Sequence, residues 1–152
     1  MLTFGTQEFF DTFREILNRD VTFRELGRGV YNATELIVIK DLGIGIWQET
    51  IDGEISSFSL VKKSDIESKE RLAELVYYVE TYDAMIKIIT GQESFVELVI
   101  NDEITFKGSM KKVTSIQAPS ERMEILLRDL TRKTIIPTRI QYQKWLSERG
   151  FI

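Results

Sequence analysis

Residues 43–62, GIGIWQETIDGEISSFSLVK, place an Asp-Gly pair between two runs of residues that favour β-strands. The pair Asp52-Gly53 predicts a two-residue hairpin turn, because both central positions of such a turn need a positive φ angle. On each side of the turn apolar and polar residues largely alternate, which is the pattern of strands with one buried face. We therefore predict strands over Gly43–Ile51 and Ile55–Lys62.

Three more strands are predicted on either side of this hairpin. Residues 35–40 contain Leu-Ile-Val-Ile, a short apolar run of high β propensity that completes an antiparallel meander. A fourth strand is expected at 75–80, around Val-Tyr-Tyr-Val, and a fifth at 103–108, where apolar and polar residues alternate. The charged residues 62–74 predict a solvated connection.

The remaining segments show apolar residues at three- and four-residue spacing, which predicts helices. The first helix follows the N-cap Thr6 and carries phenylalanines on one face. We expect Pro119-Ser120 to break the chain before a further helix. Helices are predicted over 6–18, 82–90 (ended by Gly91), 94–100, from Ser109, after Pro119-Ser120 and over 138–149. The pattern predicts one α+β domain, 1–152, with residues 138–152 as a C-terminal helical addition.

The composition restricts the chemistry. Of 152 residues, 43% are hydrophobic and 29% charged, the balance of an ordinary globular protein. Neither histidine nor cysteine is present, which excludes His-based triads, Cys nucleophiles and the His and Cys ligands of zinc sites. The net charge of −4 disfavours dense phosphate contacts, so we expect no nucleic-acid partner. Residues 1–5 have no basic signal region, and no apolar run reaches about eighteen residues. We expect a cytoplasmic protein with no stable membrane insertion.

Local motifs for catalysis are weak. Gly43-Ile44-Gly45 lacks the third glycine and the following helix of a dinucleotide site, and instead indicates close packing in a strand. The acid pairs Asp52/Glu54 and Asp102/Glu103 flank turns, where carboxylates usually face water. An enzyme would need carboxylate, Lys or Tyr chemistry in a polar cleft, with a Glu or Tyr of shifted pKa inside it.

The order of the predicted elements resembles that of the sterol carrier protein 2 (SCP-2-like) family. The local likeness is best over residues 82–112. DAMIKIITG at 83–91 resembles the family's short helix that ends in glycine, and ITFKGSM at 104–110 resembles its strand that enters a helix at a glycine. The order matches over residues 6–133, whereas the last helix has no clear counterpart. The resemblance implies a five-stranded, mainly antiparallel sheet covered by helices, with an apolar tunnel between them for sterols, fatty acids or acyl groups, and no catalytic residues.

We therefore expect a non-catalytic protein, without a cofactor or metal, that binds an apolar ligand such as a lipid in this tunnel. Burial contributes about 0.8 kcal/mol per CH₂, so a long acyl chain would bind without specific polar contacts. The alternative is a scaffold module without a ligand, in which the last helix forms a homodimer. The side chains expected to bind the ligand share apolar faces of predicted elements: Phe13, Trp47, Phe58, Leu60, Met85, Ile86, Ile89, Phe95, Val99, Phe106, Met110, Met123 and Leu127.

Overall fold

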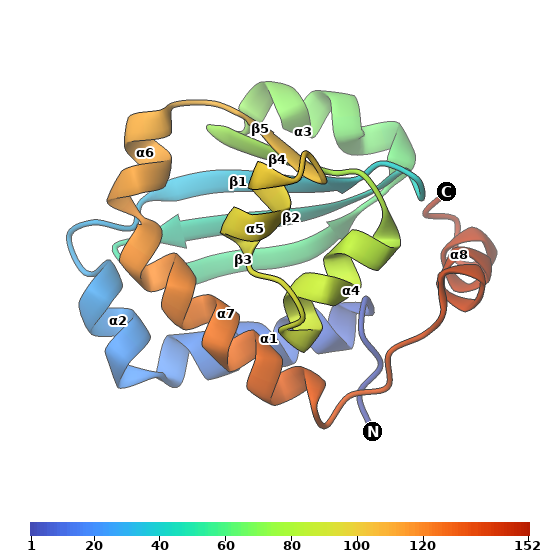
Figure 1. Ribbon diagram of the computed structural model, residues 1–152, viewed down its shortest axis with the longest axis horizontal. Coiled ribbons are helices and arrows are strands. Elements are labelled where there is room, and N and C mark those ends of the chain that lie inside the picture. The colour runs from blue at the N-terminus through green and yellow to red at the C-terminus, as the bar shows by residue number, and fades with distance from the viewer.

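A five-stranded sheet in the order β3-β2-β1-β4-β5 forms the middle of the computed structural model, which describes residues 1–152 (Figure 1). Strands β1 and β4 run parallel, and the other neighbouring pairs are antiparallel. The predicted α+β fold with a mainly antiparallel sheet is thereby confirmed. The strands are β1 Ala33–Ile39, β2 Ile44–Ile51, β3 Glu54–Val61, β4 Leu75–Val79 and β5 Ile104–Lys107.

The β2–β3 hairpin turns at Asp52 and Gly53, whose φ angles are 49° and 76°, as the Asp-Gly pair predicts. The turn touches the end of helix α2 (Val21–Gly27), where a Cβ on Gly27 would lie 2.8 Å from Gly53 Cα. Glycine at both positions lets the helix and the turn approach each other without an intervening side chain. The sequence patterns predict no element at α2, so this helix is an addition to the expected fold.

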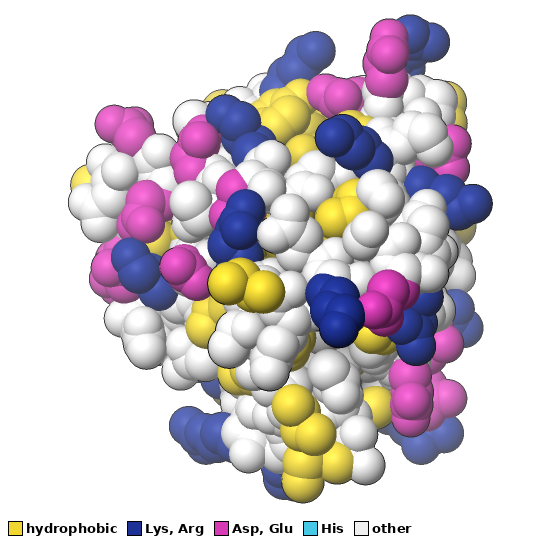
Figure 2. Space-filling view, turned by 90° about the vertical axis from the view of Figure 1, so that its right-hand side faces the viewer, with side chains coloured by type: hydrophobic (Ala, Val, Ile, Leu, Met, Phe, Trp, Pro, Cys, Tyr) yellow, Lys and Arg dark blue, Asp and Glu magenta, His cyan; other side chains and the backbone are white.

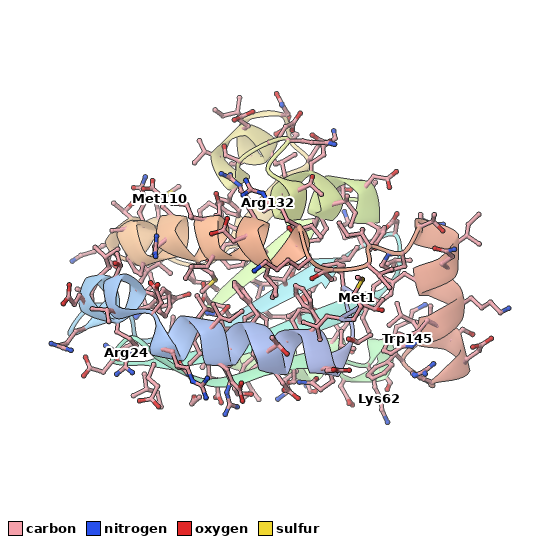
Figure 3. The ribbon with its side chains drawn as sticks, turned by 90° about the horizontal axis from the view of Figure 1, so that it is seen from below. Met1, Arg24, Lys62, Met110, Arg132 and Trp145 are labelled. Atoms are coloured by element: carbon pink, nitrogen blue, oxygen red, sulfur yellow. The ribbon has the colours of Figure 1, made fainter.

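Most helices lie on one face of the sheet (Figure 1). Between them and the sheet lies a main core of 26 buried residues, which includes Phe9, Phe10 and Phe13. Helices α1 and α7 pack against each other across this face and lie side by side in Figure 3. Besides α2, the helices on this side are α1 Gln7–Arg19, α4 Tyr82–Thr90, α5 Phe95–Ile100, α6 Met110–Ser115 and α7 Gln117–Thr131.

The opposite face of the sheet carries one short helix, α3 (Ile66–Leu72), preceded by a 3₁₀ turn at Lys63–Asp65. The predicted solvated connection at 62–74 is therefore wrong in part, because half of it is helical. Helix α3 contains no buried residue, and Ile66 is its one hydrophobic side chain that packs on the sheet, so its sequence shows no apolar stripe. Beneath it lies a second core of five buried residues, Leu36, Val38, Trp47, Val61 and Val76.

Helix α7 begins at Gln117, two residues before the expected break. Pro119 lies in its first turn, where the missing backbone N–H leaves no helical hydrogen bond unmade. The proline therefore starts this helix and does not interrupt it. The prediction of a break at Pro119-Ser120 is corrected accordingly.

The last helix, α8 (Arg139–Glu148), begins at Thr138 with a capping box to Gln141. Its side chains Tyr142 and Leu146 are buried, and Trp145 stacks between the rings of Tyr142 and Phe151 at centroid distances of 6.0 Å. Figure 2 faces this side of the molecule and shows hydrophobic side chains in separate groups among charged ones. The apolar side of α8 is thus largely used within the chain.

Candidate apolar binding site

Half-buried apolar side chains from three helices lie against the main core on the helix-covered face. We call Ile86 of α4, Phe95 and Val99 of α5, and Met123 and Leu127 of α7 the apolar helix cluster; each packs on the core without being fully covered. The Phe95 ring meets the Tyr77 ring of β4 edge-on at 5.5 Å. The Phe95 backbone N–H donates to Glu124 Oε1 of α7 over 3.3 Å. Helix α5 therefore spans from the sheet to α7.

Helix α5 is unusually apolar for the little it buries. Five of the six residues in its sequence, FVELVI, are hydrophobic, yet only Leu98 is fully buried. Val96 and Ile100 are 55% and 73% exposed. Because only one side chain is fully buried, local displacement of so short a helix costs little free energy. Of the three helices that carry the apolar helix cluster, α5 is thus the one that can separate most easily from the sheet.

The thirteen predicted ligand-binding residues divide by burial. Four lie inside the main core, which places them there without distinguishing a ligand contact from ordinary packing: Phe13, Phe58, Met85 and Ile89. Six are half-buried against it: Leu60 and the five residues of the apolar helix cluster. Phe106 is half-buried on β5, where it pairs with Tyr77 of β4.

Two predicted residues do not lie with the rest. Trp47 belongs to the second core on the opposite face of the sheet, beneath Lys69, whose ammonium lies 4.5 Å from the ring centroid. It cannot share a cavity with Phe13, because successive strand residues point to opposite faces. Met110 is 61% exposed, since α6 buries no residue, and it is labelled at the outer end of the α6–α7 pair in Figure 3.

A buried polar group lies on the same face of the sheet as the main core. We call Tyr31, Glu35, Gln48, Thr50 and Tyr77 the Glu35 cluster. The hydroxyl of Tyr31 donates to Glu35 Oε2 over 2.5 Å and that of Tyr77 to Glu35 Oε1 over 2.9 Å. The Gln48 side-chain amide donates to Tyr31 Oη over 3.0 Å and to Thr50 Oγ1 over 3.2 Å. Each carboxylate oxygen of Glu35 thus has a tyrosine partner.

Burial sets the ionisation of this cluster. It raises the pKa of Glu35, while the hydrogen bonds from Tyr31 and Tyr77 oppose the rise by stabilising the carboxylate. Burial and the neighbouring Glu35 charge raise the pKa of Tyr31 and of Tyr77 above the ordinary value. The tyrosines therefore act as neutral donors, and Glu35 is the group whose charge can change.

The sequence patterns do not single out the Glu35 cluster. The available signal is the position of Glu35 itself, because it alternates with Leu36 and Val38, which face the second core. A charged residue in the register of Ala33, Ile37 and Ile39 must point toward the main core. Its partner Tyr77 follows only from the parallel pairing of β1 with β4, which joins distant segments.

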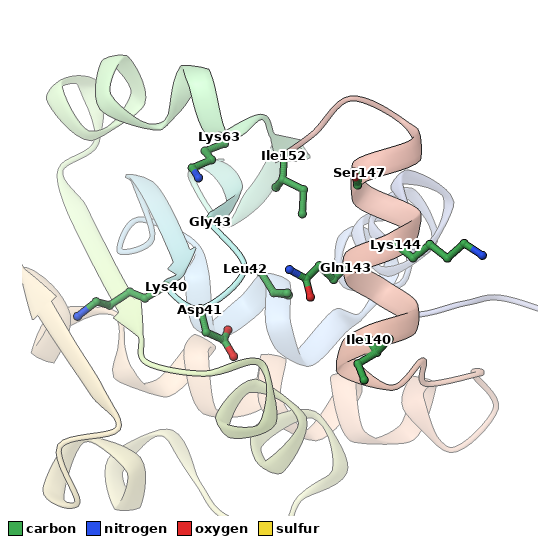
Figure 4. Close-up of a pocket in the computed structure, with 10 residues that line it drawn as sticks. All are labelled: Lys40, Asp41, Leu42, Gly43, Lys63, Ile140, Gln143, Lys144, Ser147 and Ile152. Carbon is green, nitrogen blue, oxygen red and sulfur yellow. The ribbon is translucent and has the colours of Figure 1, made fainter.

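Two pockets lie elsewhere on the surface. One, of about 640 Å³, is bounded by the β1–β2 turn and α8; in Figure 4, Gln143 and Ile152 point into it, whereas Lys40 and Lys144 direct their ammonium groups away. The other, of about 290 Å³, is formed by polar residues around α6. Neither is lined by a predicted ligand-binding residue or by the Glu35 cluster. The expected tunnel between sheet and helices coincides with neither pocket and stays a prediction.

The structure contains no group of three or more acidic side chains arranged to hold a metal ion. No helix is both long and apolar enough to cross a bilayer. The candidate site consists of the apolar helix cluster over the sheet, joined through Tyr77 to the buried carboxyl group of Glu35.

Solved structures share this architecture, although no family model and no curated protein sequence matches the chain. A crystal structure of sterol carrier protein 2 superposes with a TM-score of 0.67 at 11% identity, over 81% of this chain and 95% of that one. A conserved hypothetical protein from Thermus thermophilus gives a TM-score of 0.69 at 10% identity, over 91% and 94%. The ubiquinone-synthesis protein UbiJ gives 0.51 at 13% identity, over 76% and 92%.

At sequence identities this low, the similarity shows a shared fold. It agrees with the resemblance noted in residues 82–112, where the short helix ends at Gly91 in a left-handed conformation and β5 leads past Gly108 into α6. The chain has an SCP-2-like fold.

Proposed function

We propose that the protein binds a molecule with a long apolar chain between the sheet and helices α4, α5 and α7, without catalysing a reaction. The observation that carries this proposal is the apolar helix cluster, in which side chains from three helices lie against the core but remain half-exposed. Sharing the fold of sterol carrier protein 2 supports the same location.

The energetics of such a site are favourable. Removal of a chain of about ten CH₂ groups from water supplies about 8 kcal/mol before the cost of ordering the ligand. The chain would lie where Phe95 now packs on Tyr77, and α5 would move outward to admit it. Within α5 itself, only Leu98 would lose full burial in that movement, and burial of the ligand opposes this loss.

The chemistry of the interior supports binding over catalysis. Tyr31, Tyr77 and Glu35 have shifted pKa values, which meets one condition for an active site. The second condition is a cleft that brings a substrate to them, and neither the pocket beside α8 nor the pocket around α6 is lined by these groups. Both oxygens of Glu35 are already hydrogen-bonded, which suits a stabilising and positioning role.

The direct test is a titration of the purified, delipidated protein with a fluorescent fatty-acyl probe. Replacement Val99→Trp would fill the site from α5, and we expect it to weaken binding at least about tenfold, which corresponds to about 1.4 kcal/mol. The matched control is Ile140→Trp, because Ile140 is 76% exposed on α8. Equal affinity of the two variants and the parent protein, or no binding by any of them, would overturn the proposal.

The alternative, a homodimer through α8, rests on the one large apolar side chain that this helix exposes. Replacement Ile140→Glu would place a charge in such an interface, and sedimentation would then show a dimer converting to monomer. Deletion of residues 138–152 is a less clean test, because it would uncover the core at Tyr142 and Leu146.

A further inference from the structure

We propose that the Glu35 cluster forms the polar end of this binding site and favours a ligand whose head group is a neutral hydrogen-bond donor, such as a long-chain alcohol, over a carboxylate of the same chain length. This inference rests on the proposed function and specifies the class of ligand.

Tyr77 joins the two parts of the site. Its ring contacts Phe95 of the apolar helix cluster at 5.5 Å, and its hydroxyl lies 2.9 Å from Glu35. Both groups lie on the main-core face of the sheet. A chain that replaces Phe95 against Tyr77 would therefore bring its end to the Tyr77 hydroxyl and the Glu35 carboxyl group.

The hydroxyl and amide hydrogens around Glu35 already have acceptors. Those of the Tyr31 and Tyr77 hydroxyls point to Glu35, and the Gln48 amide donates to Tyr31 and Thr50. What remains free beside Tyr77 is acceptor capacity, namely a lone pair on Tyr77 Oη and a further lone pair on each Glu35 oxygen. A ligand hydroxyl can donate to these atoms, whereas a carboxylate or an ester has no hydrogen to donate.

The charge of Glu35 also favours a neutral head group over a carboxylate. A ligand carboxylate beside Glu35 would place two like charges in a site of low polarity, which disfavours the ionised pair. The charged groups that act on Glu35 from outside the cluster are Lys112 and Glu74. These two already face each other at 3.7 Å, so Lys112 is not a free cation for an anionic head group. A neutral donor avoids the repulsion and gains a hydrogen bond.

The experiment compares three probes of equal chain length, tetradecanol, tetradecanoate and methyl tetradecanoate, by competition against the fluorescent acyl probe at neutral pH. We expect the alcohol to bind about fivefold more tightly than the ester, the contribution of one hydrogen bond, and at least about tenfold more tightly than the carboxylate. If no probe binds, the proposed function fails. If all bind with equal affinity, or the carboxylate binds best, the proposed function stands and the preference inferred from Glu35 is overturned.

Two variants assign the preference to the cluster. Glu35→Gln removes the charge and adds an amide donor, and should reduce the preference for alcohol over carboxylate to within about threefold. Tyr77→Phe keeps the ring against Phe95 and removes the hydroxyl. It should reduce the difference in affinity between the alcohol and the ester, and it tests the proposal even if Glu35→Gln fails to fold. The control is Tyr78→Phe, because Tyr78 faces the other side of the sheet and bonds to Glu70. A preference that persists in both cluster variants, or that Tyr78→Phe abolishes equally, would contradict the assignment.

Discussion

The hydroxyl of Tyr142 donates a 2.8 Å hydrogen bond to the carbonyl of Gly5, which ties α8 to the segment that precedes α1. Gly5 has a φ angle of 85°, and a Cβ there would lie 2.4 Å from the Tyr142 ring. Both the backbone conformation and the close approach therefore require glycine at this position.

The replacement Gly5→Ala should accordingly destabilise the protein by about 3 kcal/mol, because a strained φ angle adds to the displacement of a buried ring. Gly29→Ala is the matched control, since Gly29 also has a positive φ angle of 73° but no atom within 4 Å of the added Cβ. It should cost only about 1 kcal/mol. Chemical denaturation measures both, and equal losses would show that the Tyr142 contact does not constrain Gly5.

A second prediction concerns Asp20, which serves two helices. Its carboxylate caps α2 by accepting from Phe23 N over 2.8 Å, and it forms a forked pair with Arg122 of α7 at 2.9 and 3.0 Å. Replacement Asp20→Ala should cost at least about 1 kcal/mol through the lost cap, whereas Asp20→Asn keeps the capping oxygen and removes the charge.

The pH dependence of the Asp20 pair has a defined sign. The hydrogen bond from Arg122 lowers the pKa of Asp20 below 3.8, so the pair stabilises the protein above that value and is lost as pH falls through the folded pKa. The stability difference between the parent protein and Asp20→Asn should therefore shrink from pH 7 to pH 3. Asp129→Asn should show little difference at either pH, because the Asp129–Arg132 pair is exposed. A constant difference for Asp20→Asn would contradict the role of its charge.

Glu35 should show the opposite pH dependence. Burial raises its pKa above 4.5, so between the two values the folded protein holds a proton that the unfolded chain has released. The stability that neutral Glu35 contributes is fully present below 4.5 and is lost as pH rises through the folded pKa. The free energy of unfolding of the parent protein, relative to Glu35→Gln, should thus decrease from pH 4 to pH 8. A difference that increases over this range would show that the tyrosine hydrogen bonds outweigh burial.

The strands could be predicted more completely than the helices because their signals are local. Asp52-Gly53 fixes a hairpin, and the alternation around it fixes which side chains share a face. The same alternation places Trp47 and Ile46 on opposite faces of the sheet. The position of Trp47 outside the expected tunnel therefore follows from the sequence, and its inclusion among the ligand-binding residues is wrong. Helices α2 and α3 are not predicted from the sequence. Each has seven residues and buries at most one apolar side chain, so neither shows a periodic apolar stripe.

The candidate site was less predictable because it depends on contacts between distant segments. The half-buried state of Phe95 and Val99 reflects how α5 lies between β4 and α7, which their spacing along the helix does not specify. Glu35 meets Tyr77 only after β1 and β4 pair in parallel, because the two residues are 42 positions apart in the sequence. Periodicity thus identified apolar faces, whereas the polar end of the site required the folded structure.

A last prediction tests whether α5 opens. Leu98 in α5 and Ile89 in α4 are both fully buried, so their amides differ mainly in the helices that carry them. Opening of α5 uncovers one buried side chain, whereas opening of α4 uncovers Tyr82, Ala84, Met85, Ile88 and Ile89. The Leu98 amide should therefore exchange its hydrogen at least about tenfold faster than the Ile89 amide, because local opening requires less free energy than the opening of α4.

Addition of tetradecanol should slow the Leu98 amide more than the Ile89 amide, because a ligand beneath α5 adds contacts that opening must break. Hydrogen exchange followed by NMR resolves the two positions. If Leu98 exchanges as slowly as Ile89, α5 opens only with the whole helical layer, and a ligand could not enter beside Phe95 as proposed.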